Sequence, residues 1–356
     1  MTRKSQSVTI RHVAKKAGVS VATVSRYLNR SAPISEEVSA RLEEVMAELR
    51  YVPHAAARQL ASQKTRVVGL LLNNLHNDFF VPLLNGIEAV VRKHGYNLVI
   101  ATYHSEGRDA PPPIGPHNTD GLLVFSDGLT DEDLIAHHDR NFPLVLVHRT
   151  PPPGLKIPSV TVENKKITVD LINHLINVHG KRRILFMRGP IHQEDSSWRE
   201  LGYKNALAAN GIPFDEALVL NGEFERDVAH KVLSNFLADE KHPSFDAVFT
   251  GDDDAAIGVL TALRDKGYQV PEDISVIGFD NLGFSSFLTP PLTTVSAPTE
   301  KVGQIAAEKL FSLFEEQFLE EVTLLPTELI IRRSCGCNYE SEELRQGGDQ
   351  VHIYNR

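Results

Sequence analysis

Short apolar runs that alternate with helical stretches are the feature that most restricts how this 356-residue chain can fold. The runs are VVGLLL (67–72), NLVIA (97–101), GLLVF (121–125), LVLVH (144–148), RILFM (183–187), ALVL (217–220), DAVFT (246–250) and ISVIGF (274–279). Such strands, each followed by a helix, form parallel sheets that helices cover on both faces. Because the runs fall into two groups, before and after about residue 163, we expect two doubly wound α/β subdomains. Their ligand crevice should lie at the carboxyl ends of the strands.

Charge separates a short N-terminal segment from the remainder of the chain. Residues 1 to 66 contain 12 Lys or Arg and 5 Asp or Glu, a net charge of +7. The remainder contains 25 basic and 41 acidic residues, a net charge of −16. A basic segment on an acidic body indicates contact with a polyanion, because Lys and Arg near phosphates release condensed counterions. Charge alone leaves a solvated basic terminus as the alternative.

Three short helices are predicted in the first 50 residues, which form an all-α unit. The first has apolar residues at i, i+3, i+4 and i+7, with Thr9 as its N-cap and Gly18 as the residue that ends it. Ser20 can cap a second helix directly after the turn, and a third, with a broad apolar stripe, begins at Ser35. Two short helices joined by a turn that contains glycine are typical of a helix-turn-helix.

In a helix-turn-helix unit the second helix enters the major groove of DNA. Arg26 can donate two hydrogen bonds to guanine, and Val21 and Ala22 offer apolar surface to a thymine methyl group. Short polar side chains nearby can reach phosphates, namely Thr9, Ser20, Thr23, Ser25 and Asn29. A generic three-helix interaction module is the alternative interpretation.

Two N-terminal motifs carry a resemblance to a known family. VTIRHVAKKAGVSVATVSRYLN (8–29) and RYVPHAAARQLAS (50–62) resemble the lac repressor/galactose repressor (LacI/GalR) family of bacterial transcription regulators. The resemblance implies that Val21, Ala22 and Arg26 read bases. It also implies that residues 54–62 form a hinge helix that orders on operator DNA and inserts Leu60 into the minor groove, with Ala57 and His54 as further DNA contacts. The family commonly has Asn at the position of His54.

Helix propensity and length also predict that residues 54–62 are helical only when bound. The alanines of this segment favour a helix, but about nine residues are too few to be helical alone in water. The segment therefore needs a docking surface such as DNA. An apolar side chain in the minor groove kinks the duplex.

The resemblance extends along the body of the chain. RELGYKNAL (199–207), GDDDAAIGVL (251–260), PEDISVIGFDN (271–281) and PPLTTVSAP (290–298) look like the effector-binding core of the same family, which is similar to periplasmic sugar-binding proteins. By that resemblance the chain crosses between the lobes three times, and residues 290–320 return to the first lobe. One segment departs from the family: four prolines in residues 105–121 exclude the usual helix, and we expect an extended loop there.

Candidate effector-binding residues follow from their positions at strand ends. Asp252 and Asp280 stand just after apolar runs, and Arg199 opens one of the quoted motifs. Arginine can donate two hydrogen bonds to neighbouring hydroxyls, carboxylates accept them, and aromatic rings stack on C–H surfaces, which favours a sugar. The candidate aromatic residues are Phe79, Phe80 and Phe224. The family's purine-binding member has an arginine where this chain has Gln193, which argues against a purine effector.

Neither a metal, nor a cofactor, nor catalysis is expected. The two cysteines, Cys335 and Cys337, have no Cys or His partner at a recognised spacing, and we interpret them as a reduced tail. The fifteen histidines, His174 and His179 among them, are interpreted as surface residues. No GxxxxGKS, GxGxxG, HExxH or GxSxG motif is present, so the sequence does not indicate an enzyme.

The sequence therefore predicts a division into four parts. These are a DNA-binding domain (1–52), a hinge helix and linker (53–65), a two-lobed effector-binding and dimerisation domain (66–335), and a polar tail, expected to be disordered (336–356). Tetramers of the family that this chain resembles use a C-terminal helix of leucine heptads, which the tail does not contain. The resemblance therefore implies a homodimer on pseudo-palindromic operator DNA.

The expected function is repression under the control of a small carbohydrate. No apolar run approaches the roughly 20 residues that span a bilayer, and the N-terminus has no apolar signal core, so we expect no membrane contact and a cytoplasmic location. A sugar-dependent activator is one alternative. A sugar-binding transport protein is the other, but it would need a signal peptide and no helix-turn-helix.

Overall fold

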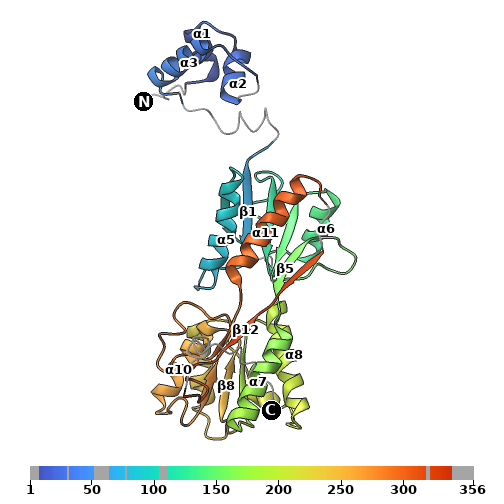
Figure 1. Cartoon of the computed structure of the whole chain (residues 1–356), viewed down its shortest axis with the longest axis vertical. Coiled ribbons are helices and arrows are strands. Elements are labelled where there is room, and N and C mark those ends of the chain that lie inside the picture. Colours follow the sequence, from blue (N-terminus) through green and yellow to red (C-terminus); the bar gives the residue numbers. More distant parts are fainter. Residues whose placement is uncertain are drawn as a thin grey trace, which may run out of the picture. The chain divides into compact units, whose positions relative to one another are not determined.

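The computed structural model describes residues 8–29, 32–51, 64–76, 78–103, 111–317 and 321–338. The chain divides into two compact units after Thr65, and each is described here by itself (Figure 1).

The N-terminal unit contains the three predicted helices, α1 (Ile10–Ala17), α2 (Val21–Asn29) and α3 (Glu36–Glu48). Thr9 is the N-cap of α1, and Gly18 ends it with φ of 65°, a left-handed conformation that glycine adopts without strain. The Oγ of Ser20 accepts a hydrogen bond of 3.0 Å from the backbone N–H of Thr23 at the start of α2. The three helices share one core, built from Val13, Ala14, Ala17, Val24, Leu42, Val45 and Tyr51. The predicted helix-turn-helix is confirmed.

The second unit begins with a lobe built on a six-stranded sheet, called here the first lobe. Its strand order is β11-β5-β4-β3-β1-β2, and every pairing is parallel. The strands are β1 (Val67–Leu72), β2 (Asn97–Thr102), β3 (Gly121–Phe125), β4 (Leu144–Val147), β5 (Ser159–Val162) and β11 (Val322–Leu325). Its helices are α5 (Phe80–Lys93), α6 (Asp131–Asp139) and α11 (Thr299–Phe314).

The second lobe is built on a four-stranded parallel sheet of order β7-β6-β8-β9. Its strands are β6 (Ile184–Arg188), β7 (Val219–Asn221), β8 (Ala247–Thr250) and β9 (Ser275–Ile277). Its helices are α7 (Lys165–His179), α8 (Glu194–Ala209), the 3-10 turn η1 (Glu216–Leu218), α9 (Arg226–Phe236) and α10 (Asp253–Asp265). β10 (Thr294–Ser296) and β12 (Glu328–Ile330) add a short antiparallel pair. Two parallel sheets flanked by helices confirm the predicted α/β class.

The three crossings between the lobes, implied by the family resemblance, are present, but the return to the first lobe begins at α11 and not at residue 290, because Leu292 and Val295 are buried in cores of the second lobe. After β10 the chain enters α11, and Val302 and Leu310 of this helix belong to the first-lobe core together with Leu83 and Ile87 of α5. β11 then pairs with β5, and β12 returns to pair with β10. Figure 1 shows α11 beside α5 and the final strands running from one lobe to the other.

The proline-rich segment contains no helix in its described part, residues 111–120, but it is not extended as predicted. It forms a compact turn, because the N–H groups of Asn118 and Thr119 donate to the carbonyl of Gly115 at 3.0 and 2.9 Å. Ile114 is buried in the core of the first lobe, and this burial holds the turn against the sheet. Residues 104–110 lie outside the described residues.

The interpretation of the cysteines as a tail is wrong, and so is that of His148 and His174 as surface residues, since each of these histidines is 1% exposed. Cys335 and Cys337 are buried in the second-lobe core, and His174 of α7 is 1% exposed beside them. Local spacing did not indicate this arrangement, because Cys337 and His174 are 163 residues apart in the chain.

The crossing of α5 and α11 in the first lobe depends on glycine. A Cβ atom on Gly86 of α5 would lie 2.0 Å from the backbone oxygen of Glu300 on α11. We therefore expect Gly86→Ala to lower the free energy of unfolding by about 1–3 kcal/mol, because the two helices must separate. Gly115→Ala is the control, since its Cβ would have no neighbour nearer than 3.7 Å. Equal urea midpoints for the two variants would contradict the prediction.

Among the described residues, no helix combines the length and the apolar character needed to cross a membrane.

Candidate DNA-recognition helix and interlobe effector site

The second helix of the N-terminal unit presents the predicted base-reading side chains to solvent. Val21 is 42% exposed, and Ala22 and Arg26 are also exposed, whereas Val24 is fully buried. The exposed side chains of Val21 and Ala22 thus offer apolar surface beside the guanidinium of Arg26. Of the predicted phosphate contacts, Thr9 and Ser20 are exposed and Thr23 and Ser25 are half-buried. The side chain of Asn29, and all of His54, Ala57 and Leu60, lie outside the described residues.

The six predicted effector-binding residues line one cavity between the lobes. Phe79 and Phe80 come from the first lobe, and Arg199, Phe224, Asp252 and Asp280 come from the second. The remaining lining residues are Asn74, His76, Phe125, Pro190, Gln193, Asp195, Glu223 and Glu225. Phe79, Phe80 and Phe125 pack edge to face with ring centroids 5.2–5.8 Å apart and form an aromatic wall.

Arg199 is the central polar group of this cavity and is only 3% exposed. Its Nε donates to Asn164 Oδ1 at 2.9 Å and its Nη1 donates to the Gly251 carbonyl at 2.5 Å. Its Nη2 donates to Asp280 Oδ1 at 3.4 Å. The guanidinium also lies 3.6 Å from the centre of the Phe279 ring. These bonds use three of the five N–H groups of a guanidinium and hold its plane in one orientation, so the others can donate to a ligand.

The carboxyl groups at the strand ends are buried, and burial raises the pKa of both. Burial, and then the negative charge of Asp280, raise the pKa of Asp252 well above its usual value. Burial also raises the pKa of Asp280, although the positive charge of Arg199 opposes the shift. One oxygen of Asp252 already accepts the N–H of Ala255 at 2.9 Å as the N-cap of α10. Carboxyl oxygens in this position can accept hydrogen bonds from hydroxyls of a ligand.

A hydrogen bond that the sequence did not predict joins the two lobes at this cavity. His148, at the end of β4 in the first lobe, contacts Asp195 Oδ2 of α8 through Nδ1 at 2.7 Å. Asn164 donates to the other oxygen of Asp195 at 2.8 Å. Burial raises the pKa of Asp195, but the charges of His148 and Arg199 and the hydrogen bonds with His148 and Asn164 together lower it below its usual value. His148 follows the run LVLV, so the strand-end rule that selected Asp252 and Asp280 would also have found it.

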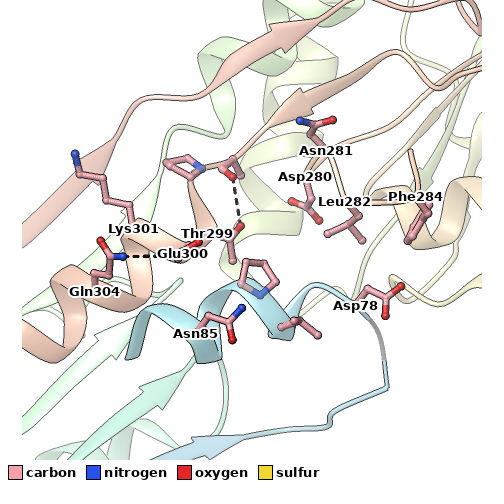
Figure 2. A pocket seen from close by; sticks show the side chains of 15 residues that line it. Asp78, Asn85, Asp280, Asn281, Leu282, Phe284, Thr299, Glu300, Lys301 and Gln304 are labelled. Carbon is pink, nitrogen blue, oxygen red and sulfur yellow. Dashed lines mark hydrogen bonds between the residues drawn. The ribbon is translucent and has the colours of Figure 1, made fainter. Parts of the chain in front are cut away.

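A second and larger cavity shares Asp280 with the first. It has a volume of about 820 Å³, against about 70 Å³ for the cavity around Arg199. Figure 2 shows Asn85 of α5 and Glu300, Lys301 and Gln304 of α11 on one side, facing Asp280 and the loop to Phe284 on the other. Ligand pockets usually enclose about 300–1,000 Å³. The cavity around Arg199, which has the buried polar groups and the aromatic wall, must therefore widen to accept a ligand.

Comparison with known proteins gives matches along nearly the whole chain. Residues 9–54 match the model of bacterial regulatory proteins of the lacI family, and residues 172–335 match the periplasmic binding protein-like domain. A probable HTH-type transcriptional repressor of Bacillus subtilis, ExuR, is 33% identical over 92% of this chain and 98% of its own length.

Two solved structures resemble this chain over more than nine-tenths of its length. The lac repressor dimer bound to operator and the anti-inducer ONPF is 26% identical, with a TM-score of 0.77 over 93% of this chain and 99% of that chain. The complex of the transcriptional regulator CelR with cellobiose is 28% identical, with a TM-score of 0.64 over 92% of this chain and 99% of that chain.

Proposed function

Because this chain belongs to the lacI family of bacterial transcriptional regulators, we propose that it is a repressor whose operator affinity is altered by a small carbohydrate bound between its lobes. The observation that carries the proposal is the convergence of all six predicted polar and aromatic residues on one interlobe cavity. The proposal includes a homodimer in the cytoplasm on a pseudo-palindromic operator, since paired recognition helices read paired half-sites.

The DNA-binding part of the proposal is supported by the exposed face of α2. Val21, Ala22 and Arg26 combine apolar surface with one guanidinium, the chemistry that distinguishes base pairs in the major groove. The net charge of +7 on residues 1–66 provides attraction to phosphates. The similar lac repressor structure is a dimer bound to operator.

The carbohydrate part is supported by the chemistry of the cavity. Arg199 offers a fixed guanidinium, Asp252 and Asp280 offer carboxyl oxygens, and Phe79 and Phe80 contribute to an apolar wall. This combination suits a ring that has hydroxyl groups at its edge and C–H bonds on its faces. CelR, one of the similar structures, is in complex with cellobiose.

An effector can change operator affinity only if it binds one arrangement of the lobes more tightly than another. A ligand with equal affinity for both arrangements leaves the equilibrium between them unchanged. Asp195 lines the cavity and also bonds His148 of the opposite lobe at 2.7 Å. A hydroxyl that competes for Asp195 weakens this bond between the lobes. The hydrogen bond between His148 and Asp195 therefore couples ligand binding to the arrangement of the lobes.

The proposal is tested by a thermal-shift screen of mono- and disaccharides, followed by anisotropy titrations on an operator selected from random duplexes. We expect one carbohydrate to raise the melting temperature and to change operator affinity. By linkage, operator DNA must change sugar affinity by the same factor. A sugar that stabilises the protein but leaves operator affinity unchanged would refute the allosteric part, and no response to any carbohydrate would refute the effector class.

A further inference from the structure

Four potential metal ligands meet in the second lobe, away from the interlobe cavity. They are His174 and His179 of α7 and Cys335 and Cys337 of the C-terminal segment. One ligand atom from each side chain lies within 4.8 Å of all the others. Cys335 and His174 are fully buried, Cys337 is 7% exposed and His179 is half-buried. Two thiols and two imidazoles are a common ligand set of structural zinc sites.

The distances between these atoms fit the edges of a tetrahedron around zinc. The Nε2 atoms of His174 and His179 are 3.3 Å apart, and Cys337 Sγ lies 3.6 and 3.4 Å from them. Zn–N bonds of about 2.0–2.1 Å and Zn–S bonds of about 2.3 Å give tetrahedral edges of about 3.3–3.4 Å between nitrogens and about 3.5–3.6 Å between sulfur and nitrogen. Three edges of the site are therefore already formed.

Hydrogen bonds to the neighbouring strand hold the cysteine segment in place. Ser275 Oγ of β9 donates to the Cys335 carbonyl at 2.8 Å, and the N–H of Val276 donates to the Ser334 carbonyl at 2.9 Å. Gly336 has φ of 111°, and a Cβ atom there would lie 3.1 Å from Nδ1 of His179. Glycine thus lets the two cysteines turn toward the histidines without a clash.

Three of the four ligand atoms already converge. The Nε2 atoms of His174 and His179, 3.3 Å apart, share at most one proton in a hydrogen bond, and Cys337 Sγ lies within hydrogen-bonding distance of both. A metal ion placed between these atoms would accept a lone pair from each of them at once, and zinc binds thiolate sulfur and neutral imidazole nitrogen. We propose that His174, His179, Cys335 and Cys337 bind one Zn²⁺ ion in a closed tetrahedral site that clips the C-terminal segment to α7.

The test uses the full chain with both thiols reduced and metal removed by chelation. Titration with Co²⁺ should produce the visible d–d bands of tetrahedral cobalt and a sulfur-to-cobalt charge-transfer band, saturating at one ion per chain. Zn²⁺ should displace the cobalt, and the zinc form should melt at a higher temperature than the apo form, because metal binding stabilises the folded state.

Variants separate metal binding from folding. His179→Gln removes a half-buried ligand, so the variant should fold, which circular dichroism checks, but its Co²⁺ affinity should fall about 100-fold or more. Cys337→Ser should remove the charge-transfer contribution of one thiolate. His117→Gln, an exposed histidine elsewhere, is the matched control and should bind like the wild type. An octahedral cobalt spectrum, no cobalt binding by the wild type, or unchanged affinity in His179→Gln would overturn the proposal.

Discussion

Replacement of Arg199 by alanine should abolish effector binding and lower the free energy of unfolding by about 3–5 kcal/mol. The guanidinium bonds Asn164 and Asp280, lies on the Phe279 ring and is 3.9 Å from Asp195. Removing it leaves buried carboxylates without their cation and removes the central donor for hydroxyls. Urea titration measures the stability, and calorimetry with the carbohydrate found in the screen measures the binding.

Two further variants distinguish loss of the site from loss of the fold. Asp280→Asn keeps the shape of the side chain, so it should reduce effector affinity with a smaller loss of stability than Arg199→Ala. Arg182→Ala removes an exposed arginine of the same lobe, whose side chain makes one long hydrogen bond to the Asn210 carbonyl, and should change neither quantity. Undiminished sugar binding in both Arg199→Ala and Asp280→Asn would mean that the effector binds elsewhere.

Operator affinity should fall by about a thousandfold when the salt concentration rises from 50 to 200 mM, as expected for a dimer that neutralises six or more phosphates. Arg26→Ala should lower operator affinity by about 1–3 kcal/mol and relax the preference at one base pair of each half-site. The physical reason is that the exposed Arg26 is the guanidinium that α2 presents for guanine. Anisotropy titrations on the selected operator and on random duplex measure both effects.

Arg41→Ala is the control for this prediction, because it removes one positive charge from an exposed position of α3. Any weakening by Arg41→Ala should be equal on operator and random duplex, since a lost charge affects all sequences alike. Salt-independent binding would contradict the electrostatic part of the prediction. An unchanged base preference in Arg26→Ala would contradict its assignment as a base reader.

Local chemistry determined much of the fold. Helix α1 begins after Thr9 and ends at Gly18 as expected. An N-cap and a glycine in the left-handed conformation fix helix ends through contacts within a few residues, so the sequence shows them directly. The run at 67–72 became β1 and the run at 121–125 became β3 with the predicted bounds. The run at 217–220 was less determined and divides between η1 and β7. The rule that strand ends line the crevice brought Asp252 and Asp280 to one cavity.

Contacts between distant segments were decided only by the tertiary structure. His148 bonds Asp195 across the lobes because the end of β4 meets the start of α8, and no local pattern records that meeting. Cys337 meets His174 because the chain enters the first lobe at α11 and then returns to the second lobe through β12, so residues 163 positions apart become neighbours. Propensity, capping and periodicity act over one or two helical turns, and therefore they determine the elements of this protein. The burial of shared apolar surface acts between elements, and it decided which side chains share a site.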